Sequence, residues 1–181
     1  MERPELSAAL ARADCVHDRE VLVRAIARVA AEIDRTLGGE PTIFLTVMQG
    51  ALAFAGQLAT AIGTPLDFDY VHATRYRGKT SGGELAWIKR PDLIFADRTV
   101  LLVDDILDEG HTLKAIRDFC IGEGARRVLV AVLCEKRHAR RVAGIAADFC
   151  GVEVPDRYVF GYGMDYHEQG RNLPAIYAVD A

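Results

Sequence analysis

Apolar runs and stretches of helical periodicity alternate along this chain. Apolar residues recur at near-helical spacing over residues 18–37, where Asp18 is a suitable cap and Gly38-Gly39 a stop. The β-branched run 42–48 ends at Gln49-Gly50, and residues 51–62 have the composition of a helix. The pattern predicts a helix, then a strand, a glycine turn and a second helix.

Strand-like segments continue through the rest of the chain. They lie at residues 66–73, 85–89, 99–103 and 128–133, with short ones at 158–160 and 176–179. Helices predicted over 20–33, 51–62 and 112–122 alternate with them, which is typical of an α/β fold with a mostly parallel sheet flanked by helices. The chain has 181 residues. That length suits a single domain, residues 1–181, with one substantial core.

Residues 100–113 hold the densest group of chemically active side chains. Four apolar residues precede the adjacent acids Asp104 and Asp105, and Asp108, Gly110 and Thr112 follow where a helix should begin. Ligands of open α/β sheets bind at the carboxyl edge of such a buried strand. Backbone N–H groups at the helix start can cradle a phosphate, and carboxylates can bind a ribose diol or Mg²⁺. Helix capping by Asp108 is the alternative, but a cap needs only one of the three acids.

This segment resembles the phosphoribosyl diphosphate (PRPP) signature of type I phosphoribosyltransferases, whose apolar, acidic, Gly and Thr positions are all met. The resemblance runs from about residue 15 to the C-terminus. It implies the type I phosphoribosyltransferase fold, with a small hood formed by the terminal segments. The family's pyrophosphate loop often has a strained or cis peptide bond before its glycine, which predicts one at Met48–Gln49, although Gln49 replaces a basic residue common in the family. The implied PRPP-binding residues are Asp104, Asp105, Asp108, Glu109, Gly110, His111, Thr112, Gln49, Gly50 and Arg171.

Two later segments resemble the hypoxanthine-guanine phosphoribosyltransferases. The resemblance implies that Lys136 contacts O6 of a 6-oxopurine and that Tyr158 stacks on the base. It also implies that Val159 supplies main-chain groups and that Asp165 lies near the metal and the base. The alternative for Lys136 is a solvated cluster with the arginines at 137, 140 and 141, and that for Tyr158 is a core aromatic on an edge strand.

The resemblance also implies a reaction, the transfer of the phosphoribosyl group from PRPP to hypoxanthine or guanine. Asp108 is the expected catalytic residue, receiving the purine N7 proton, and Mg²⁺ is the expected cofactor, with Asp165, Asp104 and Asp105 as its ligands. The polar, glycine-bearing segment 75–83 is expected to be a mobile lid that carries Tyr76, although Arg75 stands where the family usually has serine. Two alternatives stay open: an enzyme acting on xanthine or another base, and a nucleotide-sensing RNA-binding regulator of the same fold.

The charge and composition of the chain limit the kinds of partner that it is expected to bind. The net charge of −4 argues against nonspecific nucleic-acid binding. The chain shows no apolar run near the ~20 residues that cross a bilayer and no signal-peptide pattern, so we expect a cytoplasmic protein without a membrane partner. Its four cysteines show neither zinc nor disulfide spacing. The expected partners are PRPP and 6-oxopurine bases, and the resemblance implies a homodimer or homotetramer.

Overall fold

A six-stranded sheet forms the centre of the protein. The computed structural model describes residues 5–75 and 85–180. The strands stand in the order β4-β3-β2-β5-β6-β7, with β4 antiparallel to β3 and the others parallel to one another. This confirms the predicted α/β fold with a mostly parallel sheet. The bounds are β2 Thr42–Met48, β3 Leu66–Arg75, β4 Leu85–Lys89, β5 Thr99–Leu107, β6 Arg127–Lys136 and β7 Phe149–Val154.

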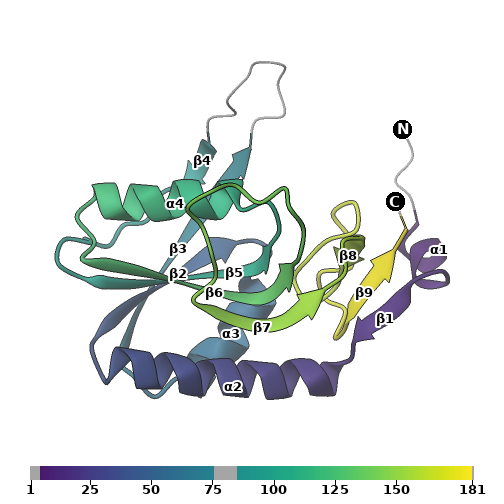
Figure 1. Cartoon of the computed structure of the whole chain (residues 1–181), viewed down its shortest axis with the longest axis horizontal. Coiled ribbons are helices and arrows are strands. Elements are labelled where there is room, and N and C mark those ends of the chain that lie inside the picture. The colour runs from purple at the N-terminus through teal and green to yellow at the C-terminus, as the bar shows by residue number, and fades with distance from the viewer. Residues whose placement is uncertain (1–4, 76–84, 181) are drawn as a thin grey trace.

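Helices cover both faces of this sheet (Figure 1). Helices α2 (Arg19–Leu37) and α3 (Leu52–Ala61) pack on one face, and α4 (His111–Gly122) packs on the other. Successive strand residues point to opposite faces, so Phe44 packs beneath α2 and α3 whereas Leu45 packs beneath α4. Asp18 caps α2 by accepting a hydrogen bond from the Val21 N–H at 2.9 Å. Both predicted helices before residue 63 and the helix predicted over 112–122 are confirmed.

A second, three-stranded antiparallel sheet joins the two ends of the chain. Its order is β1 (Asp14–His17), β9 (Ile176–Val179), β8 (Tyr158–Phe160), and α1 (Leu6–Leu10) lies beside it (Figure 1). A separate apolar cluster around Phe160 forms its core. This sheet is the hood expected from the terminal segments. The sequence pattern did not indicate β1, β7 or α1.

Strand β5 is longer than predicted. The expected strand ended at Val103, but pairing with β6 continues through Ile106 opposite Cys134 and Leu107 opposite Glu135. The partner strand supplies hydrogen-bond groups along the whole length, so Asp104 and Asp105 lie inside the strand rather than after it. Within the described part of the chain, none of the helices combines the length and apolar character needed to span a membrane.

Candidate active site

The site lies where the strand order reverses. Strands β2 and β5 are neighbours, but the chain leaves β2 for β3 on one side and β5 for β6 on the other. The loops that follow β2 and β5 therefore diverge and open a crevice at the carboxyl edge of the sheet, the usual ligand site of doubly wound sheets. The predicted pyrophosphate loop follows β2, and the predicted PRPP loop follows β5.

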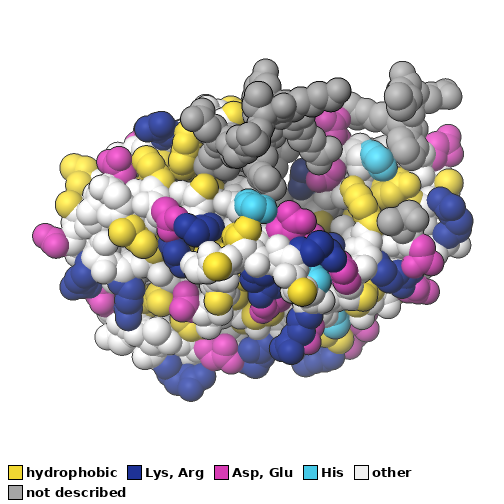
Figure 2. All heavy atoms as spheres, turned by 45° about the horizontal axis from the view of Figure 1, so that its top comes forward, with side chains coloured by type: hydrophobic (Ala, Val, Ile, Leu, Met, Phe, Trp, Pro, Cys, Tyr) yellow, Lys and Arg dark blue, Asp and Glu magenta, His cyan; other side chains and the backbone are white. Residues whose placement is uncertain are grey.

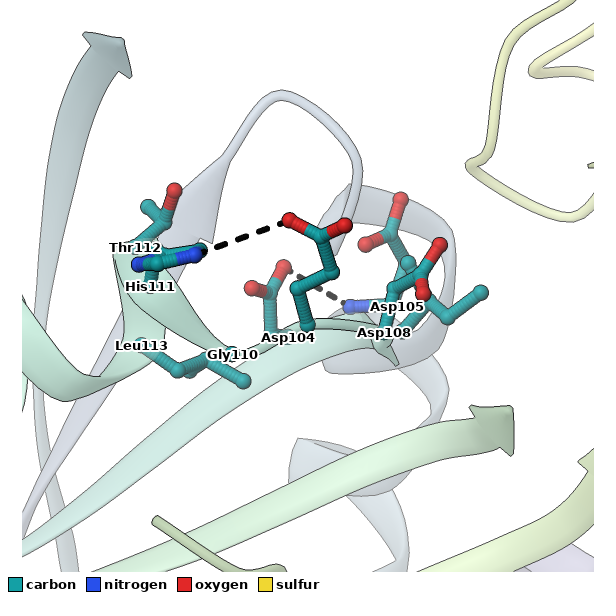
Figure 3. A pocket seen from close by; sticks show the side chains of 9 residues that line it. Asp104, Asp105, Asp108, Gly110, His111, Thr112 and Leu113 are labelled. Atoms are coloured by element: carbon teal, nitrogen blue, oxygen red, sulfur yellow. Dashed lines mark hydrogen bonds and ion pairs between the residues drawn. The ribbon is translucent and has the colours of Figure 1, made fainter. Parts of the chain in front are cut away.

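A pocket of about 310 Å³ occupies this edge, lined by residues 104–106 and 108–113 (Figure 3). Gly110 is the N-cap of α4 with φ +85°, a backbone conformation that favours glycine, and no side chain caps the helix. The first N–H groups of α4 therefore face the pocket and are available to an anion. The helix-cap alternative for Asp108 is wrong, because the cap is Gly110 and the Asp108 carboxylate bonds elsewhere.

Asp104 and Asp105 form a buried acid pair, each 8% exposed. The Asp105 N–H donates to Asp104 Oδ1 at 2.9 Å (Figure 3). Burial, reinforced by Asp105, raises the pKa of Asp104 well above its ordinary value. Burial also raises the pKa of Asp105, although a hydrogen bond with Asp104 and the Arg171 guanidinium oppose that rise. Hydroxyl donors or a cation from a ligand would favour the ionised form of this pair.

The predicted pyrophosphate loop packs directly against this pair. A Cβ built on Gly50 would lie 2.6 Å from Asp105 Cγ and closer still to Oδ2. A Cβ on Gly163 would in turn lie 3.2 Å from the Gly50 carbonyl carbon. Only glycine allows the loop after β2, the acid pair of β5 and the segment after β8 to meet at this distance. The peptide bond Met48–Gln49 is cis, as expected.

The Asp108 carboxylate accepts hydrogen bonds from two side chains, one at the end of β6 and one in the turn that follows it. Lys136 Nζ donates to its Oδ2 at 2.9 Å, and His138 Nε2 lies 2.5 Å from its Oδ1. Burial would raise the pKa of Asp108, but the hydrogen bonds from Lys136 and His138 outweigh it and hold this pKa below its ordinary value. The structure thus brings the predicted catalytic acid and the predicted base-selecting lysine together. Sequence reasoning missed His138, whose only signal was its place two residues after Lys136.

Lys136 is buried and does not belong to a solvated basic cluster, so the alternative for this residue is wrong. Lys136 itself is 8% exposed. Arg141 pairs with Glu135 and donates to the Lys136 carbonyl at 2.8 Å. Arg140 forms a bidentate pair with Asp156, with Nη2 2.6 Å from Oδ1.

The predicted purine segment lies beside the acid pair. Tyr158 is 39% exposed, and its hydroxyl donates to the Asp165 carbonyl at 3.2 Å. Its ring is partly exposed rather than a core aromatic, and it lies nearly parallel to that of His167, with centroids 6.2 Å apart. Val159 is buried and pairs with Ala178 in the hood sheet.

Arg171 connects the acids of this region. Its Nη2 pairs with Asp165 Oδ1 at 2.7 Å, its Nη1 donates to the Gly163 carbonyl at 2.7 Å, and its charge acts on Asp105. Glu109 pairs instead with His111, at 3.6 Å (Figure 3). The expected lid residue Tyr76 and segment 76–83 lie outside the described residues.

The three expected metal ligands do not make a complete protein-only centre. Across residues 5–75 and 85–180, no group of three or more His, Cys, Asp or Glu side chains is placed to hold a metal. Asp165 already pairs with Arg171 and accepts the Glu168 N–H at 2.8 Å. Mg²⁺ commonly uses one or two carboxylates and completes its shell with water and substrate phosphates. The carboxylate oxygens of the buried pair Asp104 and Asp105 are suitable ligands for a Mg²⁺ ion that also binds water and substrate phosphates.

This fold, with its phosphate loop after β5 and its acid pair at the switch point, is that of a type I phosphoribosyltransferase. The chain belongs to that family, since the model of the phosphoribosyl transferase domain matches residues 13–169. It is 34% identical over 163 residues to the hypoxanthine-guanine phosphoribosyltransferase of Aquifex aeolicus, covering 89% of this chain and 91% of that one. It is 35% identical over 158 residues to that of Bacillus subtilis, covering 87% of each.

The solved structures agree with this placement. A hypoxanthine phosphoribosyltransferase from Staphylococcus aureus superposes with a TM-score of 0.88 at 27% identity, covering 97% of each chain. Relatives of this identity and coverage place the chain within the hypoxanthine-guanine group of the family.

Proposed function

We propose that this chain transfers the 5-phosphoribosyl group of PRPP to hypoxanthine or guanine, giving IMP or GMP and pyrophosphate in purine salvage. The observation that carries this is the pair formed by Lys136 and Asp108. A donor, Nζ, and an acceptor, Oδ2, lie 2.9 Å apart beside the phosphate loop. In its N7–H tautomer, a free 6-oxopurine presents the complementary groups on one edge, the O6 acceptor and the N7–H donor. Adenine would turn an amino donor toward the ammonium and is expected to be rejected.

PRPP binding is assigned to the walls of the crevice. The N–H groups of residues 110–112, with the Thr112 hydroxyl, bind the 5′-phosphate, because they sit at the uncapped start of α4. Asp104 and Asp105 accept hydrogen bonds from the ribose hydroxyls. Backbone groups of Gln49 and Gly50, together with the Arg171 guanidinium, bind the diphosphate.

Base binding and catalysis follow from the same arrangement. Tyr158 stacks on the purine, an interaction of about 1–3 kcal/mol that tolerates different bases. Val159 offers main-chain groups to the base, and Lys136 provides the selectivity. As N9 attacks the anomeric carbon, the N7 proton passes to Asp108, whose low pKa keeps it ionised at neutral pH.

We assign Mg²⁺ to Asp104 and Asp105, with Asp165 beside them. When bound, the ion neutralises charge that accumulates on the departing pyrophosphate. The guanidinium of Arg171, which pairs with Asp165 in this region, adds positive charge that also stabilises the departing pyrophosphate.

We also propose a homodimer or homotetramer in the cytoplasm. Phe68 and Tyr70 of β3 and Ile88 of β4 lie on one face of the sheet edge and are 62%, 43% and 63% exposed. Helix α3 packs over β2 and β5, and its Leu52 is 61% exposed. A second copy of this chain would cover these apolar side chains. All four cysteines are free, as suits a reducing compartment.

The RNA-binding alternative has less support. Figure 2 shows acidic and basic side chains interspersed over the face drawn there, and the described residues on that face form no continuous basic surface. Proteins that bind RNA through electrostatics gather positive charge on one face.

The decisive test measures nucleotide formation from Mg²⁺-PRPP with hypoxanthine, guanine, xanthine, adenine and uracil in separate reactions. We expect product with hypoxanthine and guanine and little with adenine or uracil. Asp108→Asn serves as the inactive control. A preference for adenine or a pyrimidine, or no product with any base, would contradict the proposal, and a preference for xanthine would reassign the substrate.

A further inference from the structure

His138 makes a contact that the proposed reaction has not yet used. Its side chain is only 4% exposed, and its Nε2 lies 2.5 Å from Oδ1 of Asp108. The Asp108 carboxylate is by contrast 40% exposed. A nearly buried imidazole therefore holds one oxygen of a carboxylate that otherwise faces the open pocket.

The hydrogen bonds of the ring determine where its proton lies. The backbone N–H of Arg140 points at Nδ1, at 3.1 Å. A backbone N–H can only donate, so Nδ1 is an acceptor and carries no hydrogen. The ring N–H is then on Nε2, which donates to Asp108 Oδ1.

The turn that carries His138 is anchored on both sides. The Arg140 guanidinium is bidentate to Asp156, two residues before Tyr158. The Arg141 guanidinium reaches the carbonyls of Leu107, at 3.4 Å, and Lys136, at 2.8 Å. The ring is thus fixed relative to the ends of β5 and β6 and to the segment that leads into β8.

We propose that His138 is a positioning residue for Asp108. It holds Oδ1 so that Oδ2 stays in the pocket and exchanges its partner, from the Lys136 ammonium in the free enzyme to the purine N7–H in the reacting complex. This inference rests on the proposed function.

The need for such a residue follows from that exchange. When a 6-oxopurine enters, its O6 draws the Lys136 ammonium away from Asp108, and the carboxylate loses that bond. Without His138, a carboxylate that is 40% exposed would be free to turn toward water. With Oδ1 held, Oδ2 remains aimed at N7. His138 acts through this hydrogen bond and takes no part in the proton transfer itself.

Two substitutions separate this contact from a structural role of the turn. In His138→Asn the amide oxygen replaces Nδ1 and can accept the Arg140 N–H, but no atom reaches Asp108. In His138→Gln the amide nitrogen replaces Nε2 and can still donate to Asp108. Arg137→Gln is the matched control, because Arg137 lies on the same turn, is 73% exposed and pairs only with Glu153 among the described contacts.

Steady-state kinetics with hypoxanthine and Mg²⁺-PRPP should distinguish the variants. We expect kcat to fall about 10-fold to 10²-fold in His138→Asn, as for a misplaced catalytic group, with the KM for PRPP within about twofold of the parent. His138→Gln should recover most of that loss, and Arg137→Gln should match the parent.

A binding measurement gives a second, independent readout. 9-Deazahypoxanthine keeps a hydrogen on N7 and has carbon in place of the attacking N9, so it binds with Mg²⁺-PRPP without reacting. Its affinity should fall in His138→Asn and recover in His138→Gln, while the affinity for Mg²⁺-PRPP alone stays unchanged in both.

The outcomes separate this inference from the proposed function. Parent-like kcat and 9-deazahypoxanthine affinity in His138→Asn would overturn the positioning role, even with an active parent enzyme. Equal losses in the Asn and Gln variants, accompanied by a lower melting temperature, would also overturn it and assign a structural role to the turn. A parent enzyme that forms no nucleotide would instead contradict the proposed function.

Discussion

Gly50→Ala is the sharpest test of how the crevice is built. The added Cβ would lie 2.6 Å from Asp105 Cγ. Carbon atoms in contact are normally about 3.5 Å or more apart, so the carboxylate or the loop must shift by about 1 Å. Asp105 is short and 8% exposed, and its side chain can move only by leaving its position in the acid pair.

The magnitude follows from that shift. Overpacking a tight site costs about 1–3 kcal/mol of folding free energy. A displacement of about 1 Å at a group that positions substrate can reduce catalysis about 10²-fold. We therefore expect kcat/KM for PRPP to fall about 10²-fold while the protein stays folded.

The assay combines initial rates at varied PRPP, calorimetric titration with Mg²⁺-PRPP, and thermal unfolding. Gly122→Ala is the control, because a Cβ at this exposed helical position meets no atom within 4 Å. That variant should keep parent kinetics and gain up to about 1 kcal/mol in stability. Parent-like PRPP kinetics in Gly50→Ala would refute the reasoning, because the loop and acid pair would then not need their observed spacing.

Three further substitutions test other parts of the structure. Asp108→Asn should lower turnover about 10²-fold or more yet preserve PRPP binding, since the amide cannot accept a proton. Turnover within twofold of the parent would show that Asp108 is not the proton acceptor. Lys136→Ala should raise the KM for hypoxanthine far more than that for PRPP, and equal effects on both would assign it a general electrostatic role. Asp34→Ala should lower the unfolding free energy by about 2 kcal/mol at neutral pH, because its carboxylate accepts bonds from the N–H groups of Gly63 and Thr64 and from the Thr64 hydroxyl. These bonds outweigh burial and lower the pKa of Asp34. The stabilisation that Asp34 provides is therefore complete above the ordinary carboxyl pKa and is lost as pH falls through the pKa in the folded protein. A difference in unfolding free energy between variant and parent that stays constant from neutral to acid pH in urea titrations would contradict this.

The sequence by itself determined the features that depend on residues close to one another along the chain. The β-branched run 42–48 and the helical spacing over 18–37 fixed strand and helix, because side-chain period is a local property of the backbone. The strand, loop and helix start at residues 100–113 were equally predictable, since these parts are contiguous in the sequence. The cis bond at Met48–Gln49 agrees with the family resemblance.

Only the tertiary structure decided how distant segments meet. The sheet order places β2 beside β5, and this brings Gly50 against Asp105 across 55 positions of sequence. Pairing with β6 extends β5 past the acids, and the loops that pack on that strand end bury them, which raises their pKa values. No role was predicted for His138, because nothing local indicates that its ring points back to Asp108. Such contacts depend on which strand ends become neighbours and on the direction each side chain takes there, and both are set by packing of the whole fold.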